Sequence, residues 1–72
     1  MEIKVYYIRA LKGISTRALS KQTGLSIGAI NNIENEKISP RMESMEKIAR
    51  ALDVGIEDLY ESEYKYKKRS RT

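Results

Sequence analysis

The chain has 72 residues, no cysteine, no histidine and a formal net charge of +4. This length corresponds to one small domain, and the composition excludes a disulfide framework, a thiolate metal site and a histidine general base. We therefore expect no enzymatic activity, no metal and no cofactor, and no small-molecule ligand is apparent.

The charge is unevenly distributed along the chain. Residues 1–60 contain nine Lys/Arg and eight Asp/Glu, a net charge of +1, whereas residues 61–72 contain five and two, a net charge of +3. We therefore expect a nearly neutral domain over residues 1–60 and a basic, flexible tail over residues 61–72. No apolar run approaches the roughly 20 residues that span a bilayer, and no signal-peptide pattern is present, which predicts a cytoplasmic protein without a membrane partner.

Apolar spacing and turn residues predict five helices and no strand of consequence. The predicted helices cover residues 1–12, 16–23, 27–35, 42–52 and 56–60. The fourth has the longest apolar stripe and should form the main packing wall, with Met42, Met45, Ile48, Ala49 and Leu52 on one face.

The second and third helices are separated by a short turn. Ser15 and Ser26 stand at the two N-cap positions, and Gly24 interrupts the run between them. Ile30 and Ile33 share one face of the third helix, at the i, i+3 spacing of a buried stripe. Two short helices joined by a turn that contains glycine match the helix-turn-helix description, in which the second helix enters the major groove of DNA.

Many dispersed positions agree with one family pattern at fixed spacing. They are Val5, Ile8, Arg9, Gly13, Ile14, Ser15, Leu19, Gly24, Leu25, Ser26, Ile30, Ile33, Glu34, Asn35, Lys37, Pro40, Ile48, Ala49, Ala51, Leu52, Val54 and Leu59. Over roughly residues 4–60 the chain resembles the phage repressor/Cro-type helix-turn-helix family, also called the xenobiotic-response-element family. The resemblance implies an all-α, compact five-helix domain of the lambda-repressor-like type that binds operator DNA, usually as a homodimer on a palindromic site, and regulates transcription, usually as a repressor.

The resemblance also implies roles for individual residues. Arg9 and Glu34 correspond to a structural pair. The base-reading positions are Ile27, Gly28 and Asn32, with Ala29 and Asn31 close by. The phosphate-contacting positions are Thr16, Asn35, Lys37 and Arg41.

Two further interpretations concern how DNA would be read. An asparagine can pair with both N6 and N7 of adenine, and we favour Asn32 over Asn31 for this contact, although both can simply be solvent-exposed. Ile27 and Ala29 can touch thymine methyl groups, and DNA shape is expected to contribute much of the specificity. Arg17, near the start of the second helix, can reach the DNA backbone or remain a solvated charge.

Several positions depart from the family pattern. Thr16 replaces a longer glutamine, and Arg41 replaces the capping residue of the fourth helix. Glu36 stands at a customary glycine, so we expect Asn35 to hold the turn in a left-handed conformation instead. Gly28 lies within a helix, which suggests either close approach of a ligand to the backbone or a first turn that tolerates glycine.

The sequence also suggests surfaces that could contact a protein partner. Ile3, Tyr7 and Leu11 share one face of the first helix, where they either cover the last helix of the same subunit or meet a partner. The hypothetical two-fold contact comprises Tyr7, Leu11, Ile56, Leu59 and Tyr60. The alternative function is a protein-interaction module of antitoxin or antirepressor type that uses the surface otherwise predicted to bind DNA. The tail either adds attraction to DNA or is only solvated.

Overall fold

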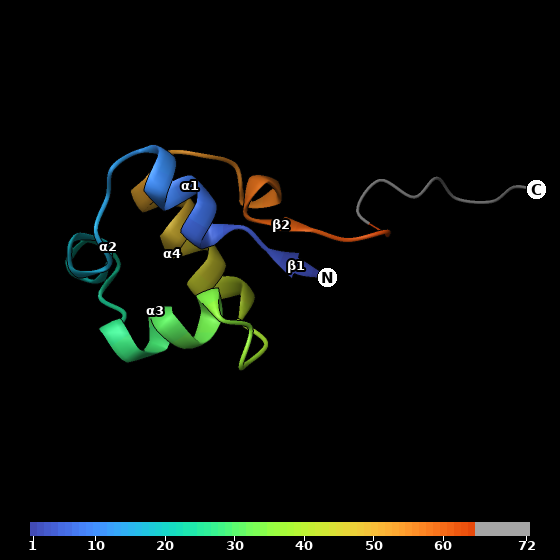
Figure 1. Ribbon diagram of the computed structural model, residues 1–72, viewed down its shortest axis with the longest axis horizontal. Helices are drawn as coiled ribbons and strands as arrows, with labels where there is room; N and C mark the ends of the chain where they lie inside the picture. The colour runs from blue at the N-terminus through green and yellow to red at the C-terminus, as the bar shows by residue number, and fades with distance from the viewer. Residues whose placement is uncertain (65–72) are drawn as a thin grey trace, which may run out of the picture.

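The computed structural model describes residues 1–64 (Figure 1). In chain order it contains strand β1 (Glu2–Ile3), helices α1 (Val5–Leu11), α2 (Thr16–Thr23), α3 (Ile27–Glu34) and α4 (Met42–Leu52), the 3-10 helix η1 (Ile56–Leu59) and strand β2 (Tyr60–Glu61). The basic tail predicted from the sequence lies outside the described residues from position 65 onward. None of the helices in the described part is long and apolar enough to cross a membrane.

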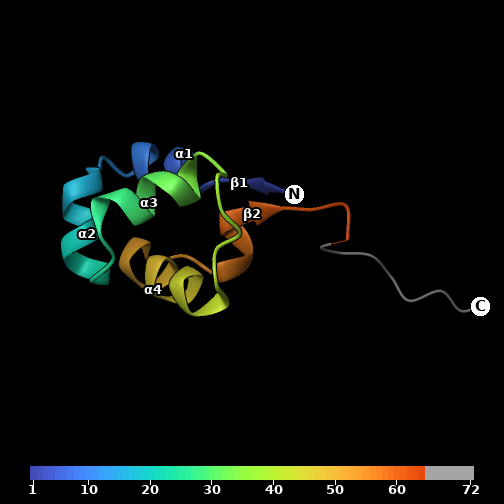
Figure 2. The same ribbon diagram turned by 90° about the horizontal axis from the view of Figure 1, so that it is seen from below.

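The four α-helices enclose a single hydrophobic core. Helix α2 packs against both α3 and α4, and α1 also contacts both of these helices (Figures 1 and 2). The buried apolar side chains are Val5, Leu19, Ile30, Ile33, Met45, Ile48, Ala49, Leu52 and Leu59. The predicted packing wall of α4 is confirmed except at its first member, because Met42 is 66% exposed.

The predicted bounds of α2 and α4 are confirmed, and α3 begins at Ile27 as predicted but ends at Glu34, one residue early. The ends of α2 and α3 are determined by neighbouring residues. The hydroxyl of Ser15 accepts a hydrogen bond from the Ala18 amide at 3.0 Å, and Ser26 caps α3 in the same way through the Ala29 amide. Gly24 adopts a left-handed conformation, with φ of 79°, which a side chain would disfavour. The turn between α2 and α3 is thus fixed by its own sequence.

The beginning of the chain differs from the prediction. The first helix begins at Val5 and not at Met1, because Glu2 and Ile3 form β1, which pairs antiparallel with β2. The Lys4 amide extends this pairing by donating to the Leu59 carbonyl at 2.7 Å. A strand of two residues has no periodicity to detect, and its partner lies at the other end of the domain.

The predicted fifth helix is also shorter than expected. Residues 56–59 form one 3-10 turn, and Tyr60 leaves it with an extended backbone to enter β2. The described residues therefore contain four α-helices and one 3-10 turn, not five α-helices. Glu61, which the charge pattern assigns to the tail, is part of β2 and pairs with Glu2.

The exposed face of α1 rules out one of the two interpretations of its apolar residues. Tyr7 is 59% exposed and Leu11 is 69% exposed, so these two side chains do not cover the last helix. Ile3 alone of the three packs against the core, and it does so from β1. With Tyr6, which is also exposed, the outer surface of α1 carries three large hydrophobic side chains in contact with solvent.

Candidate nucleic-acid interface

The turn between α2 and α3 is held by two side-chain hydroxyls. Thr23 is 8% exposed, and its Oγ1 donates to the Leu19 carbonyl at 2.8 Å and accepts from the Leu25 amide at 3.1 Å. Ser20 Oγ donates to the Leu25 carbonyl at 2.6 Å. Both backbone polar groups of Leu25 are thus satisfied, and α3 is fixed relative to α2.

The role of Thr23 was not predicted from the sequence. The available signal is a threonine in the last helical position directly before the left-handed Gly24. A hydroxyl at this position can bond back to a carbonyl of its own helix and still accept an amide from the turn.

Helix α3 presents a polar face to solvent. Ile30 and Ile33 are buried, and the opposite side carries four exposed residues at the i, i+3, i+4, i+7 spacing of one helical face. These residues, which we call the outward stripe, are Gly28, Asn31, Asn32 and Asn35. Figure 2 shows α3 on the surface, with α2 at one side and the loop that leads to α4 at the other.

The two remaining predicted base-contacting residues flank this stripe. Ile27, the first residue of α3, is 41% exposed. Ala29 is half-buried, and its amide is engaged by the cap of Ser26. The structure therefore places all five predicted base-contacting positions on α3, with Ala29 less accessible than the other four.

An ion pair attaches the end of α3 to α1. Arg9 Nε lies 2.8 Å from Glu34 Oε2 and Nη2 lies 3.1 Å from Oε1, a bidentate arrangement with side chains that are 12% and 6% exposed. The remaining Arg9 nitrogen, Nη1, donates to the Ile14 carbonyl at 3.0 Å, and the guanidinium lies over the Tyr6 ring at 5.1 Å. The hydrogen bond to Glu34 raises the pKa of Arg9 above its ordinary value, against the opposing effect of desolvation.

The residues predicted to contact phosphate lie around α3 on three segments. Thr16 and Arg17 form the first turn of α2, where Thr16 is half-buried and Arg17 is exposed. Asn35 and Lys37 follow α3 and are exposed. Arg41 is the N-cap residue of α4, but it is exposed and its side chain makes no capping hydrogen bond.

The prediction for the turn after α3 is wrong. Asn35 has φ of −90°, and Glu36 itself adopts the left-handed conformation, with φ of 58°. The Glu36 amide donates to the Ile33 carbonyl and the Lys37 amide to the Asn32 carbonyl, which is the Schellman pattern normally completed by glycine.

A contact with β1 accompanies this unusual conformation. Glu36 Oε2 accepts a hydrogen bond from the Ile3 amide at 3.1 Å. This carboxylate is therefore engaged within the molecule, toward β1, which limits the repulsion that an acid next to Lys37 would exert on a phosphate group.

The charge near α3 is basic, although the described chain as a whole is nearly neutral. Between residues 15 and 35 the charged residues are Arg17, Lys21 and Glu34, and the Glu34 carboxylate is held by Arg9. The exposed charges of the α2–α3 unit are therefore both positive. Phosphate groups approaching α3 would meet no exposed carboxylate on these two helices.

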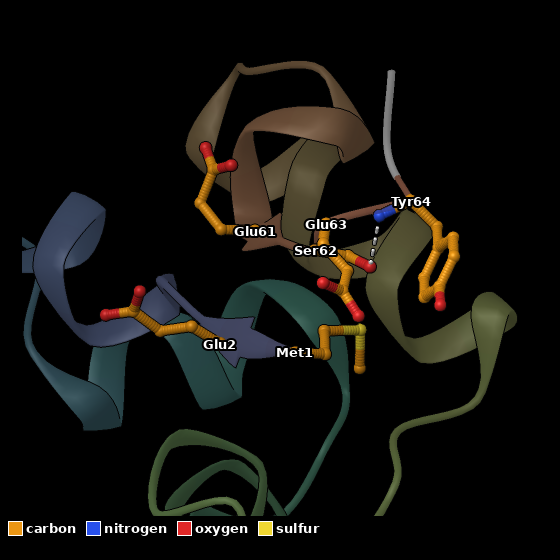
Figure 3. A pocket seen from close by; sticks show the side chains of 6 residues that line it. All are labelled: Met1, Glu2, Glu61, Ser62, Glu63 and Tyr64. Atoms are coloured by element: carbon orange, nitrogen blue, oxygen red, sulfur yellow. Dashed lines mark hydrogen bonds between the residues drawn. The ribbon is translucent and has the colours of Figure 1, made fainter. Parts of the chain in front are cut away.

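The opposite end of the molecule has a different chemistry. A wide hollow beside β1 and β2 is lined by Met1, Glu2, Glu61, Ser62, Glu63 and Tyr64 (Figure 3). It carries three carboxyl groups and lies away from α3, so it does not suit a nucleic acid. Within residues 1–64, no three His, Cys, Asp or Glu side chains are grouped so that they could hold a metal ion.

The structure changes which residues are available for the hypothetical two-fold contact. Leu59 is fully buried in the core, so its assignment to a subunit interface is wrong: its side chain is already occupied within the subunit. Ile56 and Tyr60 are half-buried and line an apolar groove of about 280 Å³ together with Met1, Pro40, Met42 and Met45. Tyr7 and Leu11 are exposed on α1.

Two short capped helices, joined through a left-handed glycine and followed by a polar outward stripe, define the chain as a helix-turn-helix protein. A family model described as "Helix-turn-helix" matches residues 5–59. A protein of Methanocaldococcus jannaschii, described as an uncharacterized HTH-type transcriptional regulator, is 37% identical over 60 residues, which cover 83% of this chain and 91% of that protein. The chain therefore belongs to the Cro/C1-type helix-turn-helix family, a family of DNA-binding regulators, and the resemblance found in the sequence is confirmed.

Proposed function

We propose that the chain regulates transcription, as a repressor, by binding double-stranded operator DNA in a sequence-specific manner through α3 in the major groove. The observation that carries this proposal is the outward stripe, a row of exposed asparagines after Gly28 on a helix that is anchored at both ends. The same proposal includes a cytoplasmic location, which the composition led us to expect. It also includes the division of the chain into a domain of about 60 residues and a tail.

Base recognition is assigned to the asparagines and to the apolar residues beside them. An asparagine amide matches the donor and acceptor edge of adenine, and Asn32 is favoured over Asn31 because it occupies a base-reading position implied by the family resemblance. Ile27 and Ala29 flank the stripe, where a thymine methyl group is the matching partner. The operator half-site is therefore expected to be rich in A·T pairs, with DNA shape adding to its selection.

Phosphate contacts are assigned to the segments that border α3. Thr16 and Arg17 at the start of α2 would meet one strand, while Asn35, Lys37 and Arg41 on the loop to α4 would meet the backbone at the other side of α3. Such contacts set the orientation of the domain and give binding a strong dependence on salt.

A homodimer is part of the proposal, because two recognition helices about 34 Å apart match one turn of DNA and a palindromic site. The apolar groove beside Ile56 and Tyr60 is its proposed contact, with Met42 at the rim. Sedimentation at high protein concentration tests this assignment. A dimer that is lost in Met42→Glu and retained in Leu11→Glu supports the groove, whereas a strictly monomeric wild type contradicts a dimer.

Selection of bound sequences from random duplex DNA tests the proposed function directly. We expect enrichment of an A·T-rich half-site, repeated as a palindrome, and a loss of about tenfold in affinity for Asn32→Ala. Lys47→Ala, on the exposed face of α4, is the matched control and should bind as the wild type does.

The alternative, a protein-interaction module of antitoxin or antirepressor type, predicts a different result. In that case no sequence is enriched, and Asn32→Ala leaves partner binding intact. The contribution of the tail, which lies outside the described residues from position 65 onward, is measured by a salt titration with and without residues 64–72. An unchanged slope of log affinity against log salt would contradict a role in DNA binding.

A further inference from the structure

Gly28 is the first residue of the outward stripe. Helix geometry places it about 160° around the axis from the buried Ile30, and it is exposed. A Cβ built on Gly28 would have Ser26 Oγ at 3.9 Å as its nearest neighbour outside the adjoining backbone, which is ordinary van der Waals contact. The missing side chain therefore faces open space.

The fold provides no reason for glycine at this position. Gly13 and Gly24 have positive φ angles of 69° and 79°, which other residues adopt with difficulty. At Gly55 an added Cβ would lie 2.5 Å from Glu57 Oε2. Neither explanation applies to Gly28, where alanine would fit in a helical conformation and favour the helix. The glycine thus lowers the stability of the free protein without an internal benefit.

The surroundings of Gly28 form a small notch of defined chemistry. Ile27 and Ala29 lie about 100° to either side on the helix, and both present apolar groups. Side chains on a helix lean toward its N-terminus, so those of Asn31 and Asn32, one turn later, lean toward the level of Gly28. The notch consequently has an apolar flank on each side and amide groups along one rim.

One feature of the major groove has matching chemistry. The 5-methyl group of thymine is the apolar group that projects from a base pair there, and the adenine edge that an asparagine amide can pair with lies in the same groove. A methyl group entering the notch would fill the space that a Cβ would otherwise occupy. Alanine at position 28 would place its own methyl group in that space.

We propose that Gly28 determines specificity, with the notch at Gly28 receiving the methyl group of one thymine in the operator half-site. This inference rests on the proposed function, since it requires α3 to enter the major groove. It adds a particular contact, made by the absence of a side chain, to the contacts assigned to Asn32 and Ile27.

The test removes a methyl group from the DNA and adds one to the protein, separately and together. The probe is the duplex that the wild-type protein selects from random DNA, together with versions in which single thymidines are replaced by deoxyuridine. We expect one such replacement to weaken binding of the wild type about fourfold, the effect of one buried methyl group. Gly28→Ala should bind the thymidine duplex at least about tenfold more weakly than the wild type, and should recover most of that loss on the duplex with deoxyuridine at the same position.

Two controls separate this effect from damage to the fold. Gly28→Ala should raise the melting temperature by about 2–5 °C, because alanine favours a helix, so weaker binding would accompany greater stability. Lys47→Ala, which also places alanine on an exposed helix face but away from α3, should leave DNA affinity unchanged.

The possible failures are distinguishable. If Gly28→Ala binds the thymidine duplex as tightly as the wild type, or loses the same factor on thymidine and deoxyuridine duplexes, the notch does not receive a methyl group and the inference is overturned while the proposed function stands. If the wild type enriches no sequence, the proposed function fails and the inference fails with it.

Discussion

The two ends of the molecule are built in opposite ways. At the end formed by α2 and α3, the helix caps and the turn are closed by hydrogen bonds between residues at most five positions apart, such as Ser15 with Ala18 and Ser20 with Leu25. At the end formed by β1 and β2, the pairing joins the start of the chain to residues 60–61. The proposed interface is therefore local in origin, whereas the frame that supports it depends on contacts between distant residues.

The two ends also differ in charge. Arg17 and Lys21 are the exposed charged groups of α2 and α3, whereas Glu2, Glu61 and Glu63 surround the hollow at the strand end (Figure 3). Within residues 1–64, this distribution would turn α3 toward the phosphates of DNA and the strands away from them, although five Lys/Arg residues follow in the sequence between positions 65 and 71.

The largest expected effect comes from the distant contact that holds α3. Arg9→Ala should lower the free energy of unfolding by about 3 kcal/mol, because it leaves the Glu34 carboxylate, 6% exposed, without its partner. Urea denaturation measures the change. The double variant Arg9→Met with Glu34→Leu should recover most of the loss, and a loss below about 1 kcal/mol in Arg9→Ala would show that the pair is not an anchor.

The end formed by α2 and α3 can be destabilised at the turn between these two helices. Thr23→Val keeps the shape of the side chain but removes the hydroxyl, so the Leu25 amide loses its acceptor, and we expect a loss of about 1–2 kcal/mol in urea denaturation. Thr23→Ser retains the hydroxyl and should lose less. Equal losses in the two variants would assign the effect to packing and not to the hydrogen bonds.

The difference in charge is tested by paired substitutions and a salt titration of DNA binding. Arg17→Gln should weaken binding several-fold and reduce the steepness of log affinity against log salt by about one. Glu63→Gln changes the net charge by the same amount at the strand end and should leave the slope unchanged. Similar slopes in both variants would mean that overall charge, and not its position, governs binding.

The smallest expected effect concerns the strand pairing. Glu2 and Glu61 lie directly opposite each other in β1 and β2, and like charges in this arrangement oppose pairing. Glu2→Lys should raise the free energy of unfolding by about 0.5 kcal/mol, measured at low salt, with a smaller gain for Glu2→Gln. A loss of stability in Glu2→Lys would indicate that the carboxylate of Glu2 supports the fold.

The contrast between the two ends explains which features could be predicted from the sequence. The bounds of α2 and α4 and the two serine caps follow from residues within a few positions, and the i, i+3, i+4 spacing shows which side of α3 faces outward. The β1–β2 pairing could not be predicted, because each strand has two residues and its partner is remote.

Three details of the site escaped prediction for a similar reason. Glu36 adopts the left-handed conformation while its carboxylate binds the Ile3 amide, a contact between positions far apart in sequence. The burial of Leu59 depends on how η1 packs, which one helical turn does not reveal. Thr23 was missed because a helix-ending threonine has several equally ordinary roles.

The anchoring of α3 at both ends has a consequence for the thermodynamics of binding. Its first turn is fixed through Ser26 and the hydroxyls of α2, and its last turn through Glu34 and the contact that Glu36 makes with β1. A recognition helix ordered before it meets its target loses little conformational entropy on docking. Calorimetry should therefore show the modest heat-capacity change of two preformed surfaces, without the larger change that accompanies folding on binding.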